Sequence, residues 1–128
     1  VQRYGEGGPV PAGSLRWATF ELDGREYSAF DGGPTFKFAE GFSLMVTCET
    51  QEEVDRLWAA FSASGDEGQC GWIKDPYGLS WQVVPSALTE MMGDPAGGNV
   101  GAMMQALLAM KKLDIAGLRA AYQGAARA

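Results

Sequence analysis

The sequence predicts an α+β protein in which strands, interrupted by one helix, are followed by a helical tail. Two motifs, Asp23-Gly24 and Asp75-Pro76-Tyr77-Gly78, each lie between runs rich in aromatic and β-branched residues, which is typical of hairpin turns. After Pro85 the pattern changes, and three N-cap signals are each followed by helical spacing. The two hairpins suggest a duplicated strand-helix-strand-strand unit whose first copy lacks its opening strand and helix.

The length bounds the number of domains. A chain of 128 residues, 46% of them hydrophobic, is long enough to close one core and too short for two independent domains. We therefore expect 1–128 to form a single domain. Its parts are the remainder of a first module over 1–36, a second module over 42–90 and C-terminal helices over 91–128.

Charge and hydropathy exclude two classes of partner. The net charge of -6 and the pI near 4.5 argue against nucleic acid, because phosphate binding needs clustered Lys and Arg. No apolar run approaches the roughly 20 residues that a membrane helix requires. The first residues do not resemble a secretory signal, so we expect a cytoplasmic protein that contacts no membrane.

The N-terminal part predicts a hairpin. Leu15 to Leu22 and Arg25 to Phe30 are its strands, and Gly5 to Ser14 is a loop that could connect two strands. Gly and Pro in Asp31-Gly32-Gly33-Pro34 stop the sheet. Because the chain begins at Val1 without a methionine, we expect further sequence upstream.

The middle part predicts a strand, a helix and a second hairpin. Phe42 to Glu49 is the strand, and Thr50 to Glu53 is a capping box that begins a helix ending near Ala63. Val54, Leu57, Trp58 and Phe61 form its apolar stripe, so Trp58 and Phe61 should pack the helix onto the sheet. Gly68 to Pro85 then forms the second hairpin.

The tail predicts three helices with N-caps at Ser86, Asn99 and Asp114. The second helix carries a methionine-rich face, and the third repeats an apolar stripe with Ile115, Leu118 and Tyr122. Core or dimer packing is a better interpretation of the methionine-rich face than ligand binding. That face comprises Val100, Met103, Met104, Leu107 and Met110.

Together these motifs resemble a known family over nearly the whole chain. The residues that carry the resemblance are Leu15 to Gly24, Asp31 to Pro34, the capping box, GQCGWIKDPYGLSWQ, and Met110 to Ile115. The chain resembles the vicinal oxygen chelate (glyoxalase/bleomycin-resistance) superfamily, in its PhnB-like branch historically labelled 3-demethylubiquinone-9 3-methyltransferase. The resemblance implies paired βαβββ modules whose curled mixed sheets surround a cavity, a C-terminal helical tail, and frequent homodimers.

The resemblance also places a metal-ligand position at Gln82, four residues beyond Gly78. Gln is a weak neutral donor and would need strong partners. The matching strands offer Phe42, Ser43 and Leu44, and Tyr27, Ser28 and Ala29, whereas a hard-metal site needs converging carboxylates. We therefore expect no metal and no other cofactor.

Several side chains are candidates for ligand contact. Gln82 shares a strand face with Ser80, and it either faces a cavity or hydrogen-bonds a neighbouring strand. Trp17, Trp72 and Trp81 could line an apolar pocket, although core packing is favoured for Trp81. The residues predicted to bind a ligand are Gln82, Ser80, Trp17, Trp72, Tyr27 and Ser28.

Other reactive groups have simpler interpretations. Glu21 and Glu26 could act as acid and base, but carboxylates beside a hairpin turn are usually solvated. Cys48 and Cys70 are expected to be free buried thiols, and no cation activates Cys70. The chain has no histidine, which removes every histidine-based triad. Neither Gly-rich stretch joins a strand to a helix, so no loop typical of a methyl-donor site is present.

The sequence therefore favours a small-molecule-binding protein of unknown ligand that lacks a catalytic metal. One alternative is a metal-dependent isomerase, lyase or resistance-type enzyme of the same superfamily, completed by residues before Val1. A second is a structural homodimer whose cavity is filled by its own aromatic side chains. Whether the protein is an enzyme stays open.

Overall fold

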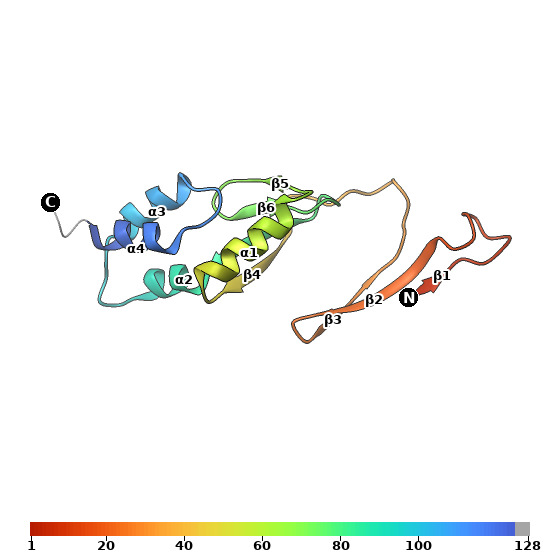
Figure 1. Ribbon diagram of the computed structural model, residues 1–128, viewed down its shortest axis with the longest axis horizontal. Helices are drawn as coiled ribbons and strands as arrows, with labels where there is room; N and C mark the ends of the chain where they lie inside the picture. The colour runs from red at the N-terminus through yellow and green to blue at the C-terminus, as the bar shows by residue number, and fades with distance from the viewer. Residues whose placement is uncertain (125–128) are drawn as a thin grey trace. The chain divides into compact units, whose positions relative to one another are not determined.

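A computed structural model describes residues 1–124 and divides the chain into two compact units. The N-terminal unit is Val1–Lys37 and the C-terminal unit is Phe38–Ala128. Seven strands and four helices form in the described residues, which confirms the α+β class (Figure 1). None of the helices within 1–124 is long and apolar enough to span a membrane.

The N-terminal unit is an antiparallel sheet of three strands in the order β1-β2-β3. β1 is Gln2–Arg3, β2 is Leu15–Leu22 and β3 is Arg25–Ala29. Asp23 and Gly24 have φ values of 49° and 74°, the left-handed pair that a two-residue type I′ turn requires. The predicted hairpin is confirmed, and the loop before it connects β1 to β2, one of the roles that the sequence allowed.

This unit has no buried side chain of its own. Trp17 stacks on Phe30 with ring centroids 5.9 Å apart, and Phe20 stacks on Tyr27 at 5.8 Å. Side chains alternate across a strand, so the two pairs lie on opposite faces of the sheet. Both faces therefore present aromatic surface.

The C-terminal unit contains one complete βαβββ module. Its strands β4 (Ser43–Cys48), β5 (Asp66–Glu67), β6 (Trp72–Lys74) and β7 (Ser80–Pro85) form a sheet in the order β4-β7-β6-β5. β4 runs parallel to β7, and the other pairs are antiparallel. β5 was not predicted, because its two residues are acidic and carry no strand pattern.

Helix α1 (Gln51–Ser62) covers one face of this sheet (Figure 1). Thr50 Oγ1 accepts a hydrogen bond from Glu53 N, as the capping box predicts, while the Glu53 carboxylate accepts from Glu49 N one residue earlier than expected. Trp58 is buried in a cluster with Cys48, Val54, Ile73 and Val83, and Phe61 packs beside it. The predicted packing of α1 on the sheet is confirmed.

The turn between β6 and β7 is held by Asp75. Gly78 N donates to Asp75 O at 3.0 Å, which closes the predicted four-residue turn. Asp75 Oδ1 accepts from Tyr77 N and Leu79 N, and Asp75 Oδ2 accepts from Trp81 Nε1 at 3.1 Å. One carboxylate thus fixes both the turn and the start of β7.

The tail forms α2 (Ser86–Gly93), α3 (Val100–Leu108) and α4 (Ile115–Gly124). Asn99 Oδ1 accepts from Ala102 N and Asp114 Oδ2 from Gly117 N, so two predicted N-caps are confirmed. The prediction for Ser86 was wrong. β7 runs directly into α2, so Pro85 occupies the N-cap position, and Ser86 Oγ instead donates to Glu49.

The methionine-rich face packs into a core formed mainly by the tail helices, as the sequence favoured. Met103 and Leu107 are buried there, with Val100, Met104 and Met110 partly buried around them. Backbone hydrogen bonds then join this tail to the sheet, from Cys70 N to Met110 O and from Gly71 N to Lys111 O. The Gln51 amide adds a clamp, donating to Leu113 O and accepting from Ile115 N.

Candidate functional site

The face of the C-terminal sheet opposite α1 carries the candidate site. The side chains on the α1 side of the sheet include the register partners Leu44, Trp81 and Ile73. Because side chains alternate along a strand, the next set of partners lies on the opposite face, and it consists of Met45, Gln82 and Trp72. Met45 is 63% exposed and Trp72 36%. We call this surface the open face.

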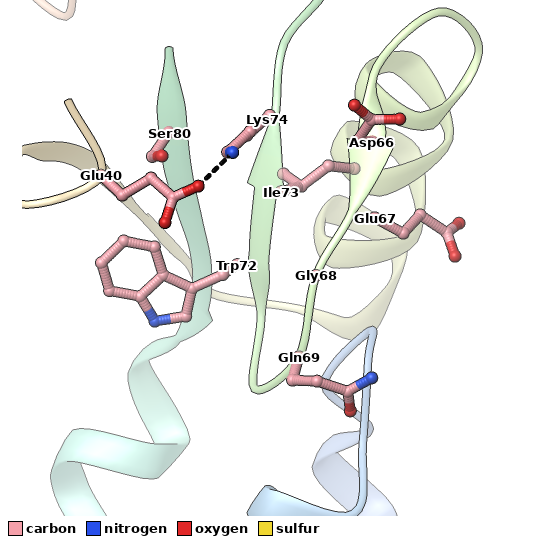
Figure 2. Close-up of a pocket in the computed structure, with 9 residues that line it drawn as sticks. All are labelled: Glu40, Asp66, Glu67, Gly68, Gln69, Trp72, Ile73, Lys74 and Ser80. Atoms are coloured by element: carbon pink, nitrogen blue, oxygen red, sulfur yellow. Dashed lines mark hydrogen bonds and ion pairs between the residues drawn. The ribbon is translucent and has the colours of Figure 1, made fainter. Parts of the chain in front are cut away.

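A pocket of about 480 Å³ lies against the open face at the β5–β6 edge, and all of its residues belong to the C-terminal unit (Figure 2). Cavities of this size suit small organic ligands. Polar and charged groups surround one aromatic ring. The lining residues are Glu40, Asp66, Glu67, Gly68, Gln69, Trp72, Ile73, Lys74 and Ser80.

Ser80 is the buried polar residue of this pocket, with 3% of its surface exposed. No side-chain hydrogen bond joins Ser80 Oγ to another of the residues 1–124. Every fully buried side-chain nitrogen or oxygen in that range has a partner, so the Ser80 hydroxyl must retain access to the pocket. It is a donor and an acceptor ready for a ligand.

Glu40 and Lys74 form an ion pair beside Ser80 (Figure 2). The hydrogen bond and charge of Lys74 hold the pKa of Glu40 below its usual value, and Glu40 in turn raises the pKa of Lys74. The side chains are 77% and 39% exposed. Exposed pairs contribute little to stability, so this pair can rearrange at small cost.

Two other acidic residues line the pocket in different ways. Glu67 Oε1 accepts a hydrogen bond from Trp58 Nε1 at 3.0 Å, so its carboxylate serves the packing of α1. Asp66 is the register partner of Lys74 on the adjacent strand and shares its face. Asp66 has neither an ion pair nor a side-chain hydrogen bond within the described residues.

The structure brings together two of the predicted ligand-binding residues, Ser80 and Trp72, in this pocket. Gln82 lies next to them on the open face, and its Nε2 donates to Ser43 Oγ at 3.0 Å. That bond matches the alternative in which the amide joins two strands. Trp81 packs against Phe61 on the α1 side, with ring centroids 5.0 Å apart, as favoured for a core residue.

The other predicted residues belong to the N-terminal unit. Trp17 lines a pocket of about 380 Å³ with Gln2, Tyr4, Arg16 and Phe30. Tyr27 is half-buried under the Phe20 ring, and Ser28 is exposed opposite Thr19. These three ligand-contact predictions are untested.

Glu40, Asp66 and Lys74 were not predicted from sequence. The spacing of Trp72 and Lys74 on one strand could have placed Lys74 beside Trp72, because residues two apart share a face. Glu40 lies in an irregular segment more than 30 residues earlier, and Asp66 lies on the unpredicted strand β5. Neither has a signal in the local sequence.

The residues present do not fit the metal site of metal-dependent relatives. Gln82 is neutral, its amide donates to Ser43 Oγ, and its register partner on β4 is Met45. Residues 1–124 contain no group of three or more His, Cys, Asp or Glu that could hold a metal ion. The donor set lacks the carboxylates and imidazoles that divalent metals prefer.

The remaining candidates have no reactive environment, and of the two thiols expected to be buried only Cys48 is, since Cys70 is partly exposed. Glu21 and Glu26 face each other across the hairpin and both are exposed, in agreement with the solvated interpretation. Cys48 and Cys70 are free thiols, and burial raises the pKa of Cys48. A thiol with a raised pKa is a poor nucleophile.

The fold and the open face define the class. A complete βαβββ module with a helix on one face, preceded by three further antiparallel strands and followed by a helical tail, is the arrangement of the vicinal oxygen chelate superfamily. The family model described as 3-demethylubiquinone-9 3-methyltransferase matches residues 1–84. The chain belongs to this family, the PhnB-like branch of the superfamily.

A solved structure is similar over much of the chain. It is a PhnB protein from Bacillus cereus that carries the name 3-demethylubiquinone-9 3-methyltransferase. It is 35% identical, with a TM-score of 0.61, and the match covers 66% of this chain and 74% of that one. No curated protein matches.

Proposed function

We propose that this chain binds a small organic molecule in the open-face pocket, without a catalytic metal. The observation that carries this proposal is the free Ser80 hydroxyl in a pocket of about 480 Å³ beside the exposed Trp72 ring. The ring offers a flat apolar surface, and the hydroxyl fixes the orientation of a polar group. Gln82, beside Trp72 on the same face, can extend the contact through its carbonyl oxygen.

Methyl transfer, which the family description names, has no support in the strand-to-helix junctions of residues 1–124. Nucleotide-like donors commonly bind a Gly-rich loop between a strand and a helix. The junctions from β4 to α1 and from β7 to α2 are Glu49-Thr50 and Pro85-Ser86, which contain no glycine. We therefore favour binding over methyl transfer.

A metal-dependent enzyme of the superfamily, completed by residues before Val1, is the alternative. Metal analysis of the full-length protein separates it from our proposal. Our proposal expects no stoichiometric divalent metal. Metal present at one ion per chain and lost on Gln82→Ala would establish the alternative.

A thermal-shift screen with small polar metabolites and antibiotics tests the binding proposal. A compound at about 100 times its dissociation constant stabilises the protein by roughly 2.7 kcal/mol. We expect compounds that stabilise the wild type and lose that effect in Trp72→Leu, while Trp17→Leu leaves it unchanged. A broad panel without any stabiliser, or with shifts unaffected by Trp72→Leu, would favour a purely structural role.

We further propose that the protein is a homodimer and that the partner covers aromatic surface of the N-terminal unit. A three-stranded sheet needs a packed apolar face for stability, yet no side chain of residues 1–37 is buried. Trp17, Phe20 and Phe30 are 41%, 44% and 67% exposed. Apolar surface of this extent marks an interaction site.

The two free thiols support a reducing compartment such as the cytoplasm.

A further inference from the structure

The charges around the open-face pocket identify the class of ligand. Glu67 is held by Trp58, which leaves Glu40, Asp66 and Lys74 as the charged groups available to a ligand. Two carboxylates against one ammonium give this group an excess of one negative charge. The whole chain, these residues included, carries a formal charge of -6. A cationic ligand is therefore attracted and an anionic one repelled.

The arrangement of these groups provides a place for the cation. In Figure 2 the Glu40 carboxylate and the Trp72 ring lie on the same side of the sheet, with Ser80 next to Glu40. An ammonium there would meet a carboxylate, the face of an indole and a hydroxyl that can accept a hydrogen bond. Ser80 is only 3% exposed, yet its hydroxyl retains access to the pocket and makes no side-chain hydrogen bond within the described residues, which points independently to a bound group.

Lys74 is paired with Glu40 in the free protein, and the fold places a second possible partner next to Lys74. Asp66 is directly opposite Lys74 on β5, at the distance where opposite charges pair across strands. Lys74 can therefore leave Glu40 for Asp66 when a ligand ammonium arrives. The exchange replaces one ion pair by two, since both carboxylates are then neutralised.

Building on the binding function proposed above, we propose that the pocket binds a small primary amine whose apolar body stacks on Trp72. Glu40 takes the ammonium in exchange for Lys74, and Ser80 accepts one of its N–H groups. The ligand class is an arylalkyl or alkyl amine small enough for a cavity of about 480 Å³.

Calorimetry with three probes that share a phenyl ring tests this proposal. The probes are phenethylamine, 2-phenylethanol and 3-phenylpropanoate at pH 7. We expect phenethylamine to bind at least about tenfold more tightly than the other two. Glu40→Gln should weaken amine binding about tenfold, whereas Glu90→Gln, on exposed helix surface with the same change of charge, should not.

Lys74→Met gives the sharpest result. In our proposal Lys74 competes with the amine, so Lys74→Met should strengthen phenethylamine binding, and Lys111→Met should leave it unchanged. Tighter binding of 3-phenylpropanoate than of the amine, lost on Lys74→Met, would overturn the amine class and leave the pocket function intact. No binding by any probe up to about 10 mM would contradict the pocket function itself.

Discussion

At the residue scale, the site depends on which carboxylates are already engaged. Glu67 and Asp75 accept hydrogen bonds from the indoles of Trp58 and Trp81, so both serve the packing of the sheet. Glu40 is paired only with the exposed Lys74, and Asp66 has no partner in the described residues. Glu67 and Asp75 therefore have structural roles, whereas Glu40 and Asp66 are available to a ligand, although the sequence alone does not distinguish the two pairs.

The pKa of Glu40 predicts how amine binding depends on pH. A lowered pKa means that the Glu40 carboxylate stays charged even somewhat below its ordinary pKa of 4.5, and the charge is lost only as the pH falls through the lowered pKa. We expect the affinity for phenethylamine to be level between about pH 5 and 8 and to fall in more acidic solution. Calorimetry in a series of buffers measures this. An affinity that rises on acidification would show that Glu40 does not hold the cation.

At the scale of elements, the C-terminal unit is held by packing on one side of its sheet and by backbone contacts at one end. Helix α1 buries Val54 and Trp58 against Ile73 and Val83. The turn before β6 donates two backbone hydrogen bonds to the segment that connects α3 and α4. These contacts leave the open face uncovered, so a ligand can bind there.

Trp58 is the largest side chain of the α1 contact. We expect Trp58→Ala to lower the free energy of unfolding by about 3 to 5 kcal/mol, because it removes a buried indole and leaves a cavity. Urea denaturation measures the change, with the exposed Glu52→Ala as control. A loss below about 1 kcal/mol would mean that this helix face is not part of the core.

Gly71 and Gly78 form a matched pair for testing the tail contact. Both have positive φ, +83° and +87°, so alanine is strained at either position. A Cβ at Gly78 meets nothing within 4 Å, whereas at Gly71 it lies 2.9 Å from Val83 O and 3.1 Å from the Leu113 side chain. We expect Gly78→Ala to cost about 1 kcal/mol and Gly71→Ala at least about 1 kcal/mol more. Equal losses would argue against close packing of the tail at Gly71.

At the scale of the whole molecule, the two units differ in how much core they have. The C-terminal unit contains two buried hydrophobic clusters, and the N-terminal unit contains no buried side chain. The N-terminal sheet therefore depends on surface from outside itself. Our proposal assigns that surface to a second copy of the chain.

Sedimentation equilibrium tests the dimer. We expect a dimer at micromolar concentration that dissociates when Phe20 and Phe30 are both replaced by serine, since the replacement removes exposed aromatic surface on both faces of the N-terminal sheet. The double variant Phe36→Ser and Tyr77→Ser, at exposed loop positions, is the control. A wild-type monomer at these concentrations would contradict the proposal.

Much of the fold was predictable because its signals are local. Turn residues at Asp23-Gly24 and Asp75 to Gly78, the capping box at Thr50 and the caps at Asn99 and Asp114 each act through neighbouring backbone groups. Ser86 misled because a serine at the first helical position looks the same in sequence as one at the cap. Strand β5 is defined by pairing with β6 alone, and two acidic residues give no indication of that.

The site was less predictable because it is assembled from distant segments. Ser80 and Trp72 could be named from strand alternation and the resemblance. Glu40 reaches Lys74 across 34 positions of sequence, and nothing near Glu40 specifies that contact. Whether Gln82 faces a cavity or bonds a neighbouring strand depended on which β4 residues lie within its reach. The parallel β4–β7 register places Met45 opposite Gln82 and Ser43 two residues away on the same face, where it accepts the amide hydrogen bond.

The most direct test of the central claim is the indole N–H spectrum of ¹⁵N-labelled protein during titration with phenethylamine. Four indole signals are expected, with that of Trp72 assigned by its loss in Trp72→Phe. The indoles of Trp58 and Trp81 donate to Glu67 and Asp75, so we predict that they stay in place while the Trp72 signal moves to saturation. Movement of the Trp17 signal with a stationary Trp72 would contradict the account, because the ligand would then bind outside the open-face pocket.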